Sequence, residues 1–549
     1  MRILHLKLLT KFRGLPAGSE FSFDNVELTE GKLEPVCLVG LNGSGKSNLL
    51  EVITEIFFFL DNYVLSEGKP LKNFKTSFGF VISYSLDITF QLARDIKWEK
   101  LGKLSWEGTR NTKILIIKEP NQLPRITLTS DNNKEIVSST DHDIFILPNH
   151  IIAYSSGQNE LISNPFIKSN YHYFELLEKK LAKEINLELG LNRLFFLDYE
   201  SSQIATICNY LFTEQKKVEL ITEELKLNEE RPIDSFSITI HYKNYRNNKI
   251  LFPLSIQSAI ENLRTCATVV EEVTEKVKGK TEEEIVELKL AFWFSLELRN
   301  AFQRIFGSAM ALFRDLYYLN LLNIHLHEVD TRRQIKNAPS MTYDNLSYMV
   351  PVPLRRKLIF VLDKIQLNKK GEDELIKYKN LSDGEHQLMH VLGSIMLLNT
   401  SGSILLYDEP ETHFNPEWRS QLITLINKAT EGKKKEDKIR QQEIFITSHS
   451  PFIVSDCRRE RVFIFDKGKV RNPEINTYGA SVNLITMKVF GKTETISEIP
   501  DSKLKKIRIL FDQKQLTKEQ AFQQTEEFGE SIEKTLLLDY LIKQNKNAF

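Results

Sequence analysis

The sequence predicts an α/β fold that a compact, mainly helical insertion splits into two parts. Three observations support this fold class. Residues 1–160 and 376–500 alternate between short apolar runs, typical of strands, and segments of helical period. Residues 161–375 consist largely of long segments of helical period, and residues 501–549 form a helical, amphipathic tail. We therefore expect both ends of the chain to build one α/β unit around the insertion.

The composition is that of an ordinary globular protein. Among 549 residues, 73 Lys and Arg balance 73 Asp and Glu and 41% are hydrophobic, which excludes a disordered, fibrous or membrane protein. Balanced charge argues against a surface that binds nucleic acid throughout, although it is compatible with a local basic groove. Four scattered cysteines without CxxC spacing favour reduced thiols in a cytoplasmic protein. Because no apolar stretch reaches about 18 residues, no membrane span is expected.

The first part of the chain is predicted to place several strands around one helix. Alternation in residues 1–9 and 20–28 predicts two strands. The apolar run 35–40 predicts a buried strand, which a helix over residues 47–64 follows. From about residue 76 to 155 the pattern is mostly that of strands separated by polar turns.

Helical period dominates the insertion. Residues 176–197, 202–225 and 282–322 are predicted as long helical segments, with residues 235–243 as a lone strand among them. Sustained heptads are absent, so the insertion is expected to be a compact domain and not a long coiled coil.

Alternation of strand and helix returns in the second part of the chain. A strand is predicted over residues 402–410, a helix over 416–430 and another strand over 442–450. The tail helix around residues 526–543 has an apolar face, which either packs on its own α/β unit or binds a partner.

The strongest motif is GLNGSGKS, which matches the phosphate-loop pattern G-x-x-x-x-G-K-[ST] between a predicted strand and a predicted helix. Glycines allow successive backbone N–H groups to face phosphate oxygens, and the helix N-terminus favours an anion. Lys46 is expected to reach the β- and γ-phosphates of ATP, and Ser47 to bind Mg²⁺. A chance glycine turn is the alternative, and the strand–loop–helix context argues against it. The predicted nucleotide-binding residues of this loop are Gly40, Asn42, Gly43, Ser44, Gly45, Lys46 and Ser47.

A second motif, SILLYDEPE, places two carboxylates at the end of a predicted buried strand. Asp408 is expected to hold Mg²⁺ beside the phosphate loop, and Glu409 to polarise the attacking water. An acidic turn before Pro410 is the alternative, which the presence of the phosphate loop disfavours.

Two further motifs could contact phosphate. In LSDGEHQ, Ser382 and Glu385 form a potential capping box, and Ser382 with Gly384 could bind an anion at the same helix N-terminus. In IFITSHSP, a predicted strand ends at His449, a candidate γ-phosphate contact, although a lone histidine is more often structural.

These four motifs, in this order, resemble the ABC-type head of P-loop ATPases, and within it the stand-alone heads related to RecF, the OLD ATPases and Rad50. The strings FRGL (12–15), DEPETHFNP (408–416) and SHSPFIV (448–454) add to the resemblance, which covers residues 1–160 and 376–460. In such heads a glutamine contacts the metal and the γ-phosphate, and the matching residue is Gln158.

The resemblance implies that ATP is sandwiched between two heads. The phosphate loop of one subunit then faces Ser382 and Gly384 of the other, and hydrolysis requires a homodimer. Lys46, Glu409 and His449 are the implied catalytic residues, and Ser47, Asp408 and Gln158 the implied Mg²⁺ contacts. The expected activity is a slow ATPase.

The layout also resembles the PtuA family, the ATPases of Septu and retron anti-phage defence systems. Few residues follow His449, and no D-x-D lies among them, so no nuclease centre is recognised in this chain. The resemblance implies an HNH nuclease partner of the PtuB type, with a retron reverse transcriptase and its RNA/DNA product also open, and a dimer or a higher oligomer. The predicted function is a sensor or regulator that controls a nuclease supplied in trans.

Two other functions stay open. A RecF-like ATPase of DNA repair would clamp duplex DNA in a basic groove, although solvated surface is the plainer interpretation of its candidate residues. Alternatively, ATP serves as a structural clamp with negligible turnover. The candidate groove residues are Arg332, Arg333, Arg355, Arg356 and Lys357.

Overall fold

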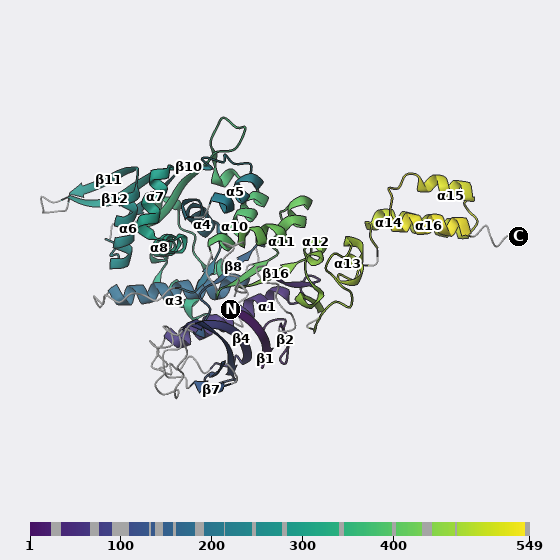
Figure 1. Cartoon of the computed structure of the whole chain (residues 1–549), viewed down its shortest axis with the longest axis horizontal. Helices are drawn as coiled ribbons and strands as arrows, with labels where there is room; N and C mark the ends of the chain where they lie inside the picture. Colours follow the sequence, from purple (N-terminus) through teal and green to yellow (C-terminus); the bar gives the residue numbers. More distant parts are fainter. Residues whose placement is uncertain are drawn as a thin grey trace.

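The computed structural model of the chain is shown in Figure 1. It describes residues 1–23, 34–65, 76–89, 109–130, 133–137, 146–157, 161–181, 192–212, 215–243, 249–276, 283–339, 345–397, 402–430, 442–466, 469–492 and 494–543, and every structural statement below concerns these residues.

A mostly parallel sheet forms the centre of the α/β unit, with strand order β18-β17-β3-β16-β15-β8-β9. Apart from the edge strand β18, its strands are short and almost wholly buried, as continuous apolar runs in parallel sheets are. β17 and β18 pair in antiparallel fashion at one edge. The strands are β3 (Val36–Gly40), β8 (Ile151–Ser155), β9 (Leu194–Phe196), β15 (Ile404–Asp408), β16 (Glu443–Ser448), β17 (Val462–Asp466) and β18 (Lys469–Arg471).

An antiparallel sheet with order β2-β1-β4-β5-β6-β7 packs on one side of α1 (Lys46–Leu65), and the parallel sheet packs on the other. Buried side chains from α1 and from both sheets form one apolar core, so α1 is apolar around most of its circumference. Figure 1 shows the purple strands of this sheet beside α1. The strands are β1 (Arg2–Leu8), β2 (Glu20–Ser22), β4 (Phe80–Thr89), β5 (Thr109–Lys118), β6 (Arg125–Ser130) and β7 (Asn133–Val137).

Carboxylates of α1 form buried ion pairs with cations from segments that are distant in sequence. A buried carboxylate is stable only when it is paired and hydrogen-bonded, so these pairs fix α1 to each segment. The pairs are Arg13–Glu51 (2.6 Å), Lys168–Glu55 (3.2 Å) and Arg193–Asp61 (3.2 Å).

The insertion contains helices and also an antiparallel sheet, with order β11-β12-β10-β13-β14. Helices are the larger share, but the prediction of one lone strand was wrong. The elements are α3 (Asn164–Leu181), α4 (Tyr199–Phe212), α5 (Gln215–Glu224), β10 (Ile233–His241), α6 (Leu254–Cys266), β11 (Val269–Lys276), β12 (Glu283–Trp293), α7 (Leu296–Phe306), α8 (Ala309–Leu321), α9 (Val329–Asn337), β13 (Phe360–Leu367) and β14 (Ile376–Lys377).

Two segments predicted as helix are strands. In β12 the buried residues Leu288, Leu290 and Phe292 alternate with more exposed ones, a period of two that runs directly into the helical period of α7. β9, predicted within a helix, extends the central sheet by pairing with β8. The insertion therefore supplies an edge strand to the α/β unit.

Helices α10 (Asp383–Leu397), α11 (Pro416–Thr430) and α12 (Pro451–Ser455) share a second core with the other face of the parallel sheet and with the insertion. α13 (Val482–Lys488) joins it through Ile485. Among the described helices, none combines the length and the apolar character that a membrane crossing requires.

The tail forms its own helical unit, called the tail unit below. It consists of α14 (Glu498–Asp512), α15 (Lys518–Thr525) and α16 (Ile532–Lys543), so α14 spans the boundary predicted at residue 501. Leu504, Leu537 and Leu541 belong to its separate apolar core. Figure 1 shows the unit in yellow, set apart from the rest of the chain.

Candidate nucleotide-binding site

The phosphate loop joins β3 to α1, as its motif predicts, and the glycines are required by its conformation. Gly40 has φ 146°, and a Cβ atom there would lie 2.4 Å from the carbonyl oxygen of Phe465 on β17. Gly45 has φ 106° and lies against the side chain of Leu15. Backbone of this kind suits glycine alone, and it leaves loop N–H groups able to face an anion.

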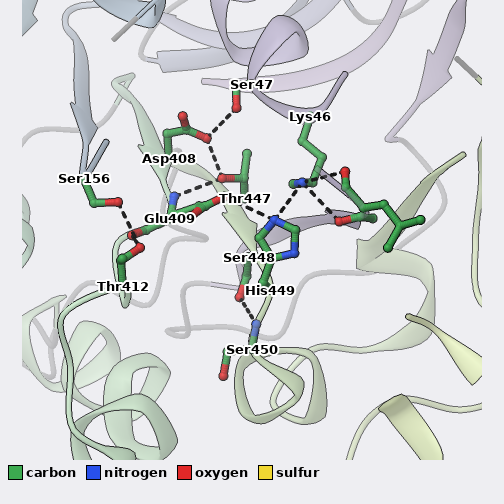
Figure 2. Close-up of polar contacts among 12 residues, drawn as sticks. Lys46, Ser47, Ser156, Asp408, Glu409, Thr412, Thr447, Ser448, His449 and Ser450 are labelled. Carbon is green, nitrogen blue, oxygen red and sulfur yellow. Dashed lines mark hydrogen bonds and ion pairs between the residues drawn. The ribbon is translucent and has the colours of Figure 1, made fainter. Parts of the chain in front are cut away.

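Lys46 opens α1 and points back across the loop (Figure 2). Its Nζ donates to the carbonyl oxygens of Gly40 at 3.1 Å and Leu41 at 3.2 Å, and lies 3.0 Å from Nε2 of His449. The residue is 5% exposed, and this burial lowers the pKa of its ammonium group. A desolvated cation beside the loop is well suited to neutralise phosphate charge.

Asp408 lies at the carboxyl end of β15, where the parallel register places Thr447 of β16 beside it. Its Oδ1 accepts hydrogen bonds from Ser47 Oγ at 2.9 Å and Thr447 Oγ1 at 2.6 Å (Figure 2). Burial raises the pKa of Asp408 in spite of these bonds. The arrangement brings the predicted Mg²⁺ contacts Ser47 and Asp408 together.

Glu409 follows directly and adopts a left-handed backbone conformation, with φ 51°. Its N–H donates to Thr447 Oγ1 at 2.9 Å, and its Oε1 lies 3.2 Å from Nε2 of His449. The contact with His449 lowers the pKa of Glu409, so its carboxylate is charged at neutral pH. An ionised carboxylate at this position can orient and polarise a water molecule.

His449 lies between Lys46 and Glu409, at the end of β16. Its Nε2 is within hydrogen-bond distance of both side chains, but one nitrogen cannot accept from Lys46 and donate to Glu409 at the same time. The ring therefore has two tautomer-dependent arrangements, one directed to each neighbour.

Ser382 and Gly384 lie at the start of α10 and not at the phosphate loop of their own chain. Glu385 accepts from the Ser382 N–H at 2.7 Å and from its hydroxyl at 3.0 Å, while the Glu385 N–H donates to Ser382 Oγ at 3.3 Å. The predicted capping box is thus present. Gly384 is packed closely, because a Cβ atom there would lie 2.8 Å from the carbonyl oxygen of His413.

The predicted contact Gln158 lies outside the described residues, and its neighbour Ser156 hydrogen-bonds Thr412 at 3.0 Å. Sequence reasoning missed Thr447, although the string IFITSHS contains it. It also missed the bidentate pair of Arg13 with Glu51, which fixes the FRGL turn to α1. The sequence pointed to this pair only through the FRGL string, which contains Arg13.

The side chains present fit ATP with Mg²⁺. Hydroxyl and carboxylate oxygens from Ser47 and Asp408 are the donors that Mg²⁺ prefers, with phosphate and water oxygens completing its coordination. In the described part of the chain, no three His, Cys, Asp or Glu side chains form a group that could hold a metal alone. Ser44 Oγ is buried without a hydrogen-bond partner among the described residues, which suits a phosphate oxygen as acceptor.

The comparison with protein families agrees with this geometry. A family model described as "AAA domain, putative AbiEii toxin, Type IV TA system" matches residues 36–455, from the first residue of β3 to the last of α12. A search of curated proteins finds no match. Because the family model covers most of the chain, the protein belongs to this AAA-domain family of P-loop ATPases.

Proposed function

We propose that the chain is an ATP-binding and ATP-hydrolysing regulator in an anti-phage defence system. One observation carries the ATPase part: beside a glycine-constrained phosphate loop, His449 contacts both Lys46 and Glu409, and Asp408 accepts a hydrogen bond from Ser47. The family description, which names a toxin of a toxin–antitoxin system, supports the defence part.

The proposed hydrolysis assigns one role to each residue. Lys46 and the loop N–H groups bind the β- and γ-phosphates, and Ser47 with Asp408 would hold Mg²⁺. Bound Mg²⁺ supplies charge neutralisation on the phosphate oxygens. Glu409 orients the attacking water, and His449 exchanges its contact with Glu409 for one with the γ-phosphate. Positioning and electrostatics then provide most of the rate.

We further propose a homodimer that closes around ATP. Ser382 hydrogen-bonds Glu385 in its capping box, and α10 packs against α4 and α11. In the described part of the chain, Ser382 makes no hydrogen bond to the phosphate loop. A second subunit would bring its Ser382 and Gly384 to the nucleotide. A higher oligomer could be built from such dimers.

The proposed partner is an HNH nuclease encoded nearby, as for the PtuA family that the sequence resembles. A retron reverse transcriptase with its RNA/DNA product is a further proposed partner. ATP turnover would then set when the nuclease is released or restrained. The family assignment supports a defence role.

The ATPase proposal is tested with purified chain and Mg·ATP. We expect slow phosphate release that Glu409→Gln abolishes while ATP binding persists and the dimer accumulates, as measured by light scattering. Identical phosphate release by the two proteins would show that Glu409 does not orient the water. The regulatory proposal is tested by co-purification with products of adjacent genes. It fails if no nuclease associates and if cells lacking those genes keep full protection.

Three candidate residues of the alternative duplex-DNA clamp form ion pairs within the chain. Arg332 pairs with Glu178 at 2.9 Å and Arg355 with Asp363 at 3.1 Å, so part of the predicted basic groove is neutralised within the chain. Arg333 lies 3.7 Å from the carboxylate of Asp330 on its own helix.

A further inference from the structure

The turn that carries Glu409 is bound by Gln387, a residue of α10 without an assigned role so far. Its Nε2 donates to the carbonyl oxygen of Glu409 at 3.2 Å, and its Oε1 accepts from the N–H of His413 at 2.8 Å. The residue is 1% exposed. One carboxamide therefore links both ends of the Glu409–His413 turn to α10.

This turn depends on its surroundings. A left-handed backbone at a residue with a Cβ atom costs about 1–2 kcal/mol, so Glu409 keeps its φ of 51° only where neighbours fix it. Thr447 binds its N–H, and Thr412 Oγ1 donates to its carbonyl oxygen at 3.0 Å. Thr447 lies on β16 beside Asp408, and Thr412 belongs to the turn itself. Gln387 is the hydrogen-bonding contact that comes from α10.

The first turns of α10 press against the same segment. Gly384 approaches the His413 carbonyl so closely that a Cβ atom would lie 2.8 Å away, and Gln387 follows one turn later. A displacement of the start of α10 must therefore be transmitted to the turn. In the proposed dimer that start contacts the nucleotide of the other subunit.

We propose that Gln387 is a positioning residue for ATP hydrolysis, which ties the conformation of Glu409 to the helix that begins with Ser382 and Gly384. The inference rests on the proposed ATPase function and adds the route by which ATP in one site aligns the water-orienting carboxylate of the other. Gln387 does not touch ATP. It acts through Glu409.

The decisive variant is Gln387→Glu, which keeps the size and the acceptor for His413 but removes the donor to Glu409. An ionised carboxylate would also repel that carbonyl oxygen. A misplacement of a catalytic group by about 1 Å costs about 100-fold, so we expect kcat to fall by about 10- to 100-fold. ATP affinity should stay within about twofold of the wild type, because the phosphate loop is not altered.

A pH profile separates positioning from simple loss of structure. The introduced carboxyl is buried, which raises its pKa, and once protonated it can again donate to the Glu409 carbonyl. Glu409 itself stays ionised, since its pKa is lowered. The ratio of variant to wild-type kcat should therefore rise as the pH falls from about 8 to about 6. A ratio independent of pH would overturn the proposal.

Ser394→Ala is the matched control on the same helix. Ser394 is fully buried and hydrogen-bonds the Val391 carbonyl and the Tyr407 hydroxyl, neither of which belongs to the Glu409–His413 turn. We expect it to change kcat by less than about twofold. Equal losses of kcat in both variants, or unchanged kcat in Gln387→Glu, would overturn the proposal. Absence of ATP hydrolysis in the wild type would instead refute the proposed function.

Discussion

Replacing Lys46 with methionine removes a buried cation while nearly conserving the volume of the side chain. In the structure its Nζ donates to two carbonyl oxygens of the phosphate loop and contacts His449. When ATP binds, at least two of these donors should turn to phosphate oxygens. Each charge-assisted hydrogen bond contributes about 1.5–3 kcal/mol, so the loss is about 3–6 kcal/mol. We therefore expect ATP affinity to fall by about 10²- to 10⁴-fold.

The chain offers a matched control in Lys118, another buried lysine. Its Nζ donates to the carbonyl oxygens of Thr76, Phe78 and Glu119 at 3.1, 3.1 and 2.8 Å, and burial lowers its pKa as well. Lys118→Met leaves three carbonyl oxygens, one of them in a buried hydrogen bond, without this donor, and should lower the free energy of unfolding by about 3 kcal/mol. It should leave ATP affinity unchanged.

The assay is a titration of each protein with Mg·ATP by calorimetry, combined with thermal unfolding. The expected result is a large affinity loss for Lys46→Met, and an unchanged affinity with a clear loss of stability for Lys118→Met. Retention of ATP affinity by Lys46→Met within about threefold would refute the site. Equal weakening by both variants would show that buried charge, and not phosphate contact, determines affinity.

Three further predictions follow from buried groups and from the tail. Burial raises the pKa of Glu411 to about 7, so the folded state binds more protons than the unfolded state between about pH 4.5 and 7, and stability falls as the pH rises through this window. Glu411→Gln should raise stability at pH 8 by up to about 3 kcal/mol and have little effect below pH 4.5, as measured by thermal melts. Arg13→Met should destabilise the chain by about 3–5 kcal/mol because Glu51 loses its buried partner, and the double variant with Glu51→Leu should recover most of this in denaturant unfolding. Removal of residues 494–549 should leave ATP affinity unchanged in calorimetry, since the tail unit has a separate core, and a lost affinity would contradict that separation.

The sequence predicted the features that depend on local pattern. The phosphate loop, the carboxylates after β15 and the capping box each occupy a short segment whose residue types determine its geometry. The sequence did not predict Thr447 because its role depends on the register of β16 beside β15. It did not predict Gln387 because that role depends on the packing of α10 against the Glu409–His413 turn. Neither the strand register nor the helix packing can be inferred from the residue pattern of a single strand or helix.

The strand errors have an equally physical origin. The alternation comprises only three buried side chains, Leu288, Leu290 and Phe292, before the helical period begins. A sequence window long enough to detect a helix therefore includes both patterns and favours the helix. β9 has three residues, too few for any period. Its assignment depends on pairing with β8, which is a tertiary contact.

The order of strands in the central sheet has a consequence for how the protein is made. β3, which leads into the phosphate loop, lies between β16 and β17, so Val36 pairs with Phe445 and Cys37 with Val462. At about 5–20 residues per second, ribosomal synthesis would leave β3 without either neighbour for roughly 20–80 s. A nascent or prematurely terminated chain that ends before β16 and β17 therefore lacks both neighbours of β3, and the nucleotide site cannot assemble until these strands have been made.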